Sequence, residues 1–169
     1  MKLKIVKPQI KYLNQLEKLK NDFIDSGESS DGIHGSADLL DFKNTTDWID
    51  FVNKGIGKNN WVPFRQYLIV DKTDILLGLI NLRFSLNDYL LNYGGHIGYY
   101  VSPKHRNKGV ASKTLYQVLQ ICKKEKIDKV LITCLDTNIA SEKVIIKNGG
   151  VFEDVRSNGE HNYKRFWIK

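Results

Sequence analysis

The sequence predicts one α/β domain over residues 1–169, in which a mixed sheet of about seven strands has about four helices on its faces. Three observations support this fold class. Segments with helical periodicity alternate with strand-like segments, and residues 129–135 form a continuous apolar run typical of a buried strand. The strands in 66–84 and 151–168 follow each other through short turns. Such hairpins exclude a doubly wound dinucleotide-binding fold.

The N-terminal third contains a strand, a helix, a long loop and a second helix. Residues 2–7 alternate between polar and apolar, as in a strand. Residues 10–24 place apolar side chains on one helical face. Residues 25–45 are rich in Gly, Ser and Asp, which predicts a long irregular loop with at most one helical turn; such loops are often binding segments. Residues 46–56 form a short helix.

The middle of the chain is rich in strands. Residues 66–70 and 75–84 flank a turn at 71–74 and predict a hairpin. Gly78 inside the second strand indicates a bulge or a close approach of another backbone segment. Residues 94–102 predict a further strand.

The C-terminal part alternates again. Residues 109–126 form an amphipathic helix, and the apolar run at 129–135 follows it as a buried strand. Residues 138–148 form a helix that ends at a pair of glycines. Residues 151–157 and 161–168 form a hairpin around an Asn-Gly turn.

Composition narrows the function classes. The net charge is +7, but the lysines are spread along the chain without a basic stripe interleaved with aromatics, so we expect no nucleic-acid partner. No apolar run reaches the ~20 residues needed to span a membrane, and the N-terminal residues lack a signal-type apolar region. Cys122 and Cys134 lie in apolar patterns typical of buried free thiols, which suits a reducing cytosol. The four histidines and two cysteines show no metal-binding spacing, so we expect a cytoplasmic protein without a metal site.

One segment carries chemistry. After the strand at 94–102, Pro103 ends the extended run, and residues 106–111 lead directly into the next helix. The first N–H groups of a helix have no intrahelical acceptor, and the helix dipole is positive at that end. Small residues at 109 and 111 let a diphosphate approach the backbone, while Arg106 and Lys108 add positive charge. The segment therefore predicts an anion site at a helix N-terminus.

The pattern of this site resembles a known superfamily. It lacks the Walker A and Gly-x-Gly-x-x-Gly patterns, and it matches Arg/Gln-x-x-Gly-x-Gly/Ala, the pyrophosphate loop of the GNAT (GCN5-related N-acetyltransferase) superfamily. The segment 138–141 resembles the Asn-x-x-Ala/Ser helix start of the same superfamily. The segments Gly94–Tyr99 and Ile132–Cys134 resemble a group of uncharacterised predicted bacterial acetyltransferases. The resemblance covers roughly residues 3–168.

The resemblance implies a fold and a reaction. In the GNAT fold a mostly antiparallel sheet splays into a V, and the pantetheine arm of CoA lies in the opening. The protein would then transfer an acetyl group from acetyl-CoA to a primary amine that attacks the thioester directly. The resemblance implies cofactor contacts from the strand, the loop and the next two helices, at Tyr99, Tyr100, Val101, Arg106, Asn107, Lys108, Gly109, Val110, Ala111, Ser112 and Asn138.

The sequence does not single out the general base or the general acid. His96 lies near the sheet opening, where its ordinary pKa near 6.5 suits a base acting through water, but it can equally be a core histidine bonded to the backbone. Glu28 in the long loop is the rival base, and Asp31, His34 and Asp38 are weaker candidates. Many relatives place a tyrosine acid in the last helix, where this chain has Ile145. Either the thiolate leaves unaided or another tyrosine, such as Tyr100 or Tyr93, protonates it.

Two other functions remain as alternatives. A CoA-binding module without catalysis would keep the same loop, and the missing tyrosine favours it slightly. A basic nucleic-acid-binding domain would not need the loop at all. The amine acceptor is not indicated by any motif. Dimers are frequent in the superfamily, so by analogy a homodimer stays open beside a monomer.

Overall fold

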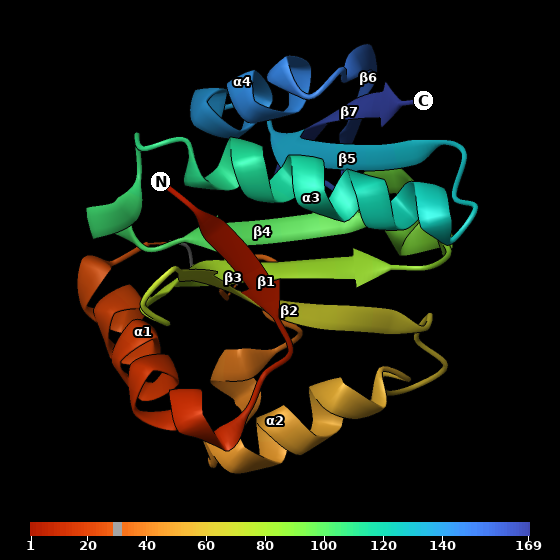
Figure 1. The fold of residues 1–169 in the computed structure, drawn as a ribbon. Helices are drawn as coiled ribbons and strands as arrows, with labels where there is room; N and C mark the ends of the chain where they lie inside the picture. The colour runs from red at the N-terminus through yellow and green to blue at the C-terminus, as the bar shows by residue number, and fades with distance from the viewer. Residues whose placement is uncertain (29–31) are drawn as a thin grey trace.

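The computed structural model describes residues 1–28 and 32–169. Its strands form two antiparallel sheets (Figure 1). The first sheet has the order β1-β2-β3-β4 and the second has the order β5-β7-β6. The strand bounds are β1 Leu3–Val6, β2 Phe64–Asp71, β3 Leu76–Arg83, β4 Ile97–Val101, β5 Val130–Leu135, β6 Val151–Ser157 and β7 Asn162–Ile168.

Four α-helices surround these sheets in the described part of the chain: α1 Leu13–Ser26, α2 Thr45–Lys54, α3 Val110–Lys124 and α4 Ile139–Lys147. Three short 3-10 turns occur as well: η1 Ile10–Tyr12, η2 Leu39–Asp41 and η4 Pro103–His105. A π-helical turn, η3 Leu90–Gly94, precedes β4 and takes up Gly94, which the sequence had predicted to be in the strand. The order of strands and helices confirms the predicted α/β architecture.

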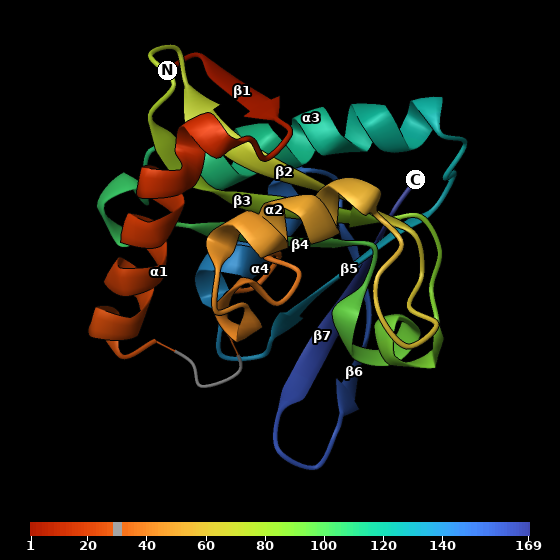
Figure 2. The same cartoon turned by 90° about the horizontal axis from the view of Figure 1, so that it is seen from below.

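The first sheet lies between two layers of helix. Helices α1 and α2 cover one face, and α3 crosses the other face, as the two views show (Figures 1 and 2). Alternate residues of the strands therefore feed two separate cores. Leu68, Leu79 and Tyr100 belong to the core under α1 and α2. Ile69 and Ile80 belong to the core under α3, which continues into the second sheet.

The two sheets meet at one position. The backbone N–H of His96 donates to the carbonyl of Leu131 (2.7 Å), and the N–H of Leu131 donates to Nδ1 of His96 (2.9 Å). Both strands that follow this contact, β4 and β5, run in the same direction and lead into the starts of α3 and α4 (Figure 1). In the hydrogen-bond ladders of the described residues they do not pair, so the sheets are separate beyond this junction.

Two glycines allow close backbone contacts on β4. A Cβ on Gly78 would lie 2.1 Å from the carbonyl oxygen of Tyr100, and the β2–β3 register shifts opposite this residue. Both readings of Gly78 from the sequence, a bulge and a close approach, are confirmed. Gly35 packs in the same way on β4, since a Cβ there would lie 2.2 Å from the carbonyl oxygen of Gly98. The buried Gln66 donates to the carbonyl of Gly35 (2.8 Å) and holds this loop against the sheet.

Candidate active site

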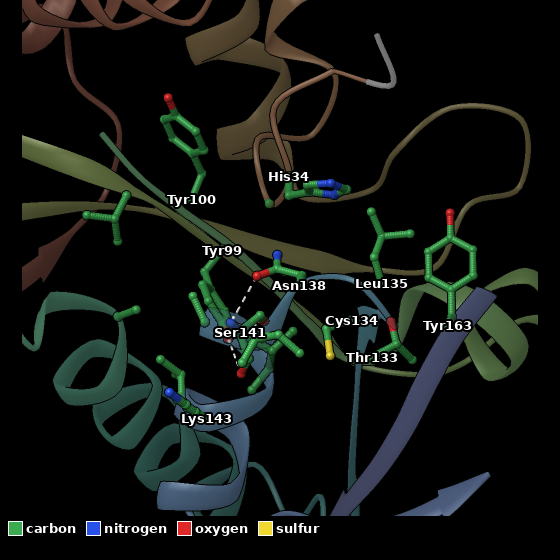
Figure 3. A pocket seen from close by; sticks show the side chains of 18 of the residues that line it. His34, Tyr99, Tyr100, Thr133, Cys134, Leu135, Asn138, Ser141, Lys143 and Tyr163 are labelled. Carbon is green, nitrogen blue, oxygen red and sulfur yellow. Dashed lines mark hydrogen bonds between the residues drawn. The ribbon is translucent and has the colours of Figure 1, made fainter. Parts of the chain in front are cut away.

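A cavity of about 1170 Å³ opens where β4 and β5 separate (Figure 3). One wall is β4, and the starts of α3 and α4 form the second. The third wall comes from segments distant in sequence: Glu28 and the loop at 34–35, the turn at 89–94, and the β6–β7 turn. In Figure 3, His34, Asn138 and Tyr163 approach the cavity from the loop at 34–35, the start of α4 and strand β7.

The edge of β4 that faces the cavity has free backbone groups. At the two ends of the strand the ladder bonds to β3 involve His96, whose carbonyl accepts from Arg83 (2.8 Å), and Ser102, whose N–H donates to Leu77 (2.9 Å). Hydrogen-bonded and non-bonded pairs alternate in an antiparallel ladder. The even-numbered residues of β4 therefore pair with β3, and the odd-numbered ones direct N–H and C=O toward the cavity. An extended amide-containing ligand can pair with this edge.

The start of α3 supplies a cluster of unsatisfied donors. The first intrahelical bond runs from Lys113 N–H to the carbonyl of Gly109 (3.1 Å), so the N–H groups of residues 110–112 have no acceptor within the helix. Gly109 has φ +74°, and a Cβ there would meet no atom within 4 Å. Asn107 is also left-handed, with φ 59°. The first turn of α3 contains no acidic side chain. This end of the helix is thus open to an anion.

Arg106 joins this helix start to the loop after α1. Its Nε donates to the carbonyl of Val101 (2.9 Å), and its guanidinium lies 5.4 Å from the centre of the Tyr100 ring. Its Nη2 donates to both carboxylate oxygens of Glu28, at 2.9 and 2.8 Å. The sequence predicted Arg106 as a phosphate ligand and Glu28 as a base, and the structure places them in contact with each other at the cavity.

The start of α4 carries a pair of hydroxyl groups. Asn138 caps the helix through Oδ1, which accepts from the N–H of Ser141 (3.0 Å). The hydroxyl groups of Ser141 and Tyr99 are 2.7 Å apart, and either can be the donor. Burial raises the pKa of Tyr99 far above its ordinary value, so this phenol stays protonated at neutral pH. Figure 3 shows the two side chains pointing toward each other from α4 and β4.

His96 does not line the cavity. Its side chain is 6% exposed, and its Nδ1 accepts the N–H of Leu131. Burial, together with the charge of Arg83, lowers the pKa of His96 to about 4. A neutral ring with an acceptor Nδ1 joins the two sheets, and this geometry matches the core-histidine reading rather than the base.

The other predicted cofactor residues fall on the cavity, with one exception. The lining includes Tyr99, Tyr100, Val101, Arg106, Asn107, Gly109, Val110, Ala111, Ser112 and Asn138. Lys108 is exposed outside the lining, and its Nζ donates to the carbonyl of Lys104 (3.0 Å). Among the weaker candidates, His34 lines the cavity, Asp38 is exposed and is not a lining residue, and Asp31 lies outside the described residues.

Neither Tyr100 nor Tyr93, the two tyrosines suggested as proton donors to the thiolate, directs an available hydroxyl group into the cavity. The Tyr100 hydroxyl is buried in the core and has no hydrogen-bond partner among the described residues. The Tyr93 hydroxyl donates to the carbonyl of Ser157 (3.3 Å). Ile145, at the position where many relatives have a tyrosine, is fully buried. The hydroxyl groups that do reach the site from these two elements are those of Tyr99 and Ser141.

Sequence reasoning missed several lining residues. Arg83 ends the apolar strand β3, and this lone cation after a hydrophobic run was the only signal for it. Glu160 and Tyr163 come from the final hairpin, whose sequence has no site pattern. Cys134 lines the cavity as a free, buried thiol with its pKa raised by burial to about 11, which does not suit a nucleophile.

The described residues contain no group of three or more His, Cys, Asp or Glu side chains placed to hold a metal ion. None of the helices in this part of the chain is both long and apolar enough to cross a membrane.

Comparison with known proteins gives the same fold and a family. The family model described as "Acetyltransferase (GNAT) domain" matches residues 37–151. No curated protein matches the sequence. Solved structures match over nearly the whole chain. The three described next are below 25% sequence identity, so they support the fold and not a specific activity.

One is the microcin C7 self-immunity acetyltransferase MccE in complex with acetyl-CoA and AMP, with 20% identity, a TM-score of 0.70 and coverage of 99% of this chain and 92% of that one. A second is RimL, a ribosomal L7/L12 alpha-N-protein acetyltransferase in complex with CoA, with 16% identity, a TM-score of 0.71 and coverage of 99% and 94%. A third is the spermidine N-acetyltransferase from Vibrio cholerae in complex with CoA and spermine, with 18% identity, a TM-score of 0.66 and coverage of 99% and 95%.

Proposed function

Since the chain belongs to the GNAT acetyltransferase family, whose N-acetyltransferases use acetyl-CoA, we propose that it acetylates a primary amine by direct attack of the amine on the thioester. The nitrogen forms a bond to the acetyl carbon and the carbon–sulfur bond breaks. The amine loses one proton and the CoA thiolate gains one. No covalent acyl-enzyme is required, which agrees with the unsuitable thiol of Cys134.

This proposal rests on one observation: the free edge of β4 and the open N-terminus of α3 lie side by side in the same cavity. The free edge of β4 suits the amides of the pantetheine arm, and the open start of α3 suits the pyrophosphate. Arg106 adds charge at the point between them. The spacing follows from the fold, because η4 Pro103–His105 is the only element between strand and helix.

Proton removal from the amine falls to a carboxylate in this proposal. Glu28 and Glu160 are the two acidic side chains among the described residues that line the cavity. Either can accept a proton from the ammonium through water. Glu28 lies on the cofactor side, where Arg106 holds it, and Glu160 lies on the opposite side at the β6–β7 turn. His96 serves instead as the link between the sheets.

The Tyr99–Ser141 pair is the proposed hydrogen-bond donor to the leaving thiolate, which takes its proton from water. The pair sits beside Asn138, which the resemblance assigns to the pantetheine arm, so its hydroxyl groups face the region of the sulfur. A thiol pKa lies near 8.5, so the leaving thiolate needs only modest help. A hydrogen bond from either hydroxyl would stabilise the developing negative charge.

Thermal melting with acetyl-CoA, CoA and ATP in parallel tests the cofactor. At a ligand concentration about 100 times Kd, binding to the folded state should raise Tm by about 5–10 °C with acetyl-CoA and CoA. ATP should give no comparable shift. Arg106→Gln should reduce the shift, whereas Arg65→Gln, on β2 outside the cavity, should not.

Thiol release with a panel of amines then tests the reaction. Release that requires an amine would support the enzyme. Stabilisation by acetyl-CoA without release for any amine would favour the catalytically silent CoA-binding module. The absence of both stabilisation and release would refute the proposal, and the nucleic-acid alternative would then be tested by its steep salt dependence.

A further inference from the structure

Arg83 is a cation that lines the cavity beside β4. It is the last residue of β3, and its Nη1 donates to the carbonyls of Gly94 (3.1 Å) and Gly95 (3.3 Å). Its Nη2 lies 3.1 Å from the point that a Cβ on Gly98 would occupy. The lack of a side chain on Gly98 thus leaves room for the guanidinium against β4, where the side chain is held in place and lines the cavity.

The charge of Arg83 has no carboxylate partner among the described residues. Residues 1–28 and 32–169 contain no salt bridge to it, and its Nε and Nη2 donate to none of these residues. Burial lowers the pKa of Arg83 to about 10, which still leaves it charged at neutral pH. The charge of Asp38 acts on Arg83 from a distance, but no described carboxylate forms a salt bridge with it. A half-buried cation that lacks a directly bonded counter-ion is costly, and one that lines a ligand cavity indicates an anionic ligand.

The rest of the cavity strengthens this reading. Glu28 is already bonded to Arg106, and the remaining cations among the described lining residues are Arg83 and Lys143, against the single carboxylate of Glu160. Such a surface is poorly suited to a polyamine, which carries only positive charge. It suits a ligand with a negative group beside its amine.

We propose that Arg83 binds the carboxylate of the amine acceptor, so that the substrate is an amino acid or a similar amino-carboxylate. The inference rests on the proposed function and names the acceptor class of that same site. Nε and Nη2 of an arginine form a fork that matches the two oxygens of a carboxylate. The two carbonyls on Nη1 hold the side chain so that this fork is pre-organised.

A row of aromatic rings continues from this point. Tyr89 and Tyr93 have ring centres 5.7 Å apart, and Tyr93 and Tyr163 have ring centres 5.6 Å apart. All three line the cavity. An acceptor held by its carboxylate at Arg83 would place its side chain along these rings.

The test compares acceptors that differ only in the carboxylate. The panel contains amino acids beside their decarboxylated amines, such as tyrosine with tyramine, tryptophan with tryptamine and histidine with histamine, together with spermidine. Thiol release is measured for the wild-type chain, Arg83→Met, Arg83→Lys and the matched control Arg65→Met. Arg65 also sits on a strand of the first sheet, but it pairs with Glu125 (3.2 Å) outside the cavity.

We expect wild-type kcat/KM to be at least about tenfold higher for the amino acid than for its decarboxylated partner. Arg83→Met should lower kcat/KM for the amino acid on the order of 10- to 100-fold, mainly through KM, and change the partner amine by less than about threefold. Arg65→Met should change neither. The Tm shift with acetyl-CoA should be the same in all variants.

Three results would overturn the proposal: no amino acid is acetylated, decarboxylated amines are preferred, or Arg83→Met lowers both partners equally. In each case an intact Tm shift with acetyl-CoA leaves the proposed function standing, so the two failures are distinguishable. If Arg83→Met does not fold, the proposal is tested instead by the kinetics of Arg83→Lys and by inhibition of the wild-type protein with a carboxylic acid. A carboxylic acid that lacks the amine must compete with the acceptor, and absence of competition refutes the carboxylate site.

Discussion

His96 offers the sharpest test of how the two sheets are joined. Replacing it with asparagine keeps an oxygen acceptor near the place of Nδ1, so the N–H of Leu131 retains its partner, while the titratable ring is removed. Replacing it with alanine removes the acceptor and leaves that buried N–H unsatisfied, at a cost of about 1–3 kcal/mol. If the ring is a structural link, His96→Asn should be more stable than His96→Ala at every pH.

The pH dependence has a sign fixed by the structure. The pKa of His96 falls from 6.5 in the unfolded chain to about 4 in the folded one, so the unfolded state binds more protons between these values. Stability is therefore complete above pH 6.5 and is lost as pH falls toward 4. A difference of about 2.5 pKa units corresponds to about 3 kcal/mol when the loss is complete. Neither His96→Asn nor His96→Ala should show this share of the loss.

Urea unfolding of the three proteins between pH 4.5 and 7.5 measures the effect as the difference between wild type and variant, which cancels the carboxylates that titrate in both. A flat difference would refute the buried, neutral ring. Activity supplies the second readout. A general base contributes about 10²- to 10⁴-fold, so a comparable loss of kcat in a folded His96→Asn variant would return the catalytic role to His96. A kcat within about threefold of wild type would exclude that role.

Three other perturbations test the cofactor half. Gly109→Glu should abolish the Tm shift with CoA, because the new carboxylate enters open space at the start of α3 and repels the phosphates. The side chain at φ +74° should lower stability by about 1 kcal/mol without unfolding the protein, and retained CoA affinity would disprove the anion site. Glu28→Gln should tighten CoA binding up to about fivefold by calorimetry, since a half-exposed ion pair of up to about 1 kcal/mol no longer competes for Arg106; weaker binding would contradict this. Tyr99→Phe and Ser141→Ala should each lower kcat about 10- to 100-fold with KM for acetyl-CoA unchanged, and normal rates would mean that the thiolate leaves unaided.

Local signals in the sequence were sufficient for the element order, and they predict the anion site at the start of α3. Periodicity defines α1 and α3 because each buries one face. The strand-Pro-Gly-helix succession at 101–110 is set by backbone chemistry within ten residues, so the sequence alone predicts Arg106 and Gly109 at the start of this helix.

Contacts across the chain were beyond sequence reasoning. Glu28 meets Arg106 across 78 residues, and His96 meets the backbone of Leu131 across 35. No local pattern encodes either pairing, because both depend on how the layers pack. The separation into two sheets has the same origin: pairing of β5 with β7 rather than β4 is a tertiary choice. Arg83 illustrates the limit, since a cation after a hydrophobic strand reads equally as a surface residue.

The walls of the cavity differ in how freely they can evolve. In the proposed site, the cofactor half uses backbone groups of β4 and the first turn of α3, which come from one continuous stretch of chain and tolerate little change of conformation. In the proposed site, the acceptor half uses side chains from three separate segments: Arg83, the turn at 89–94, and the β6–β7 hairpin with Glu160. Under this proposal, substitutions in these segments would change which amine is acetylated without changing the binding of acetyl-CoA. In this arrangement the acetyl-CoA site depends on one continuous segment, whereas the residues that would select the amine can change independently in each of three segments.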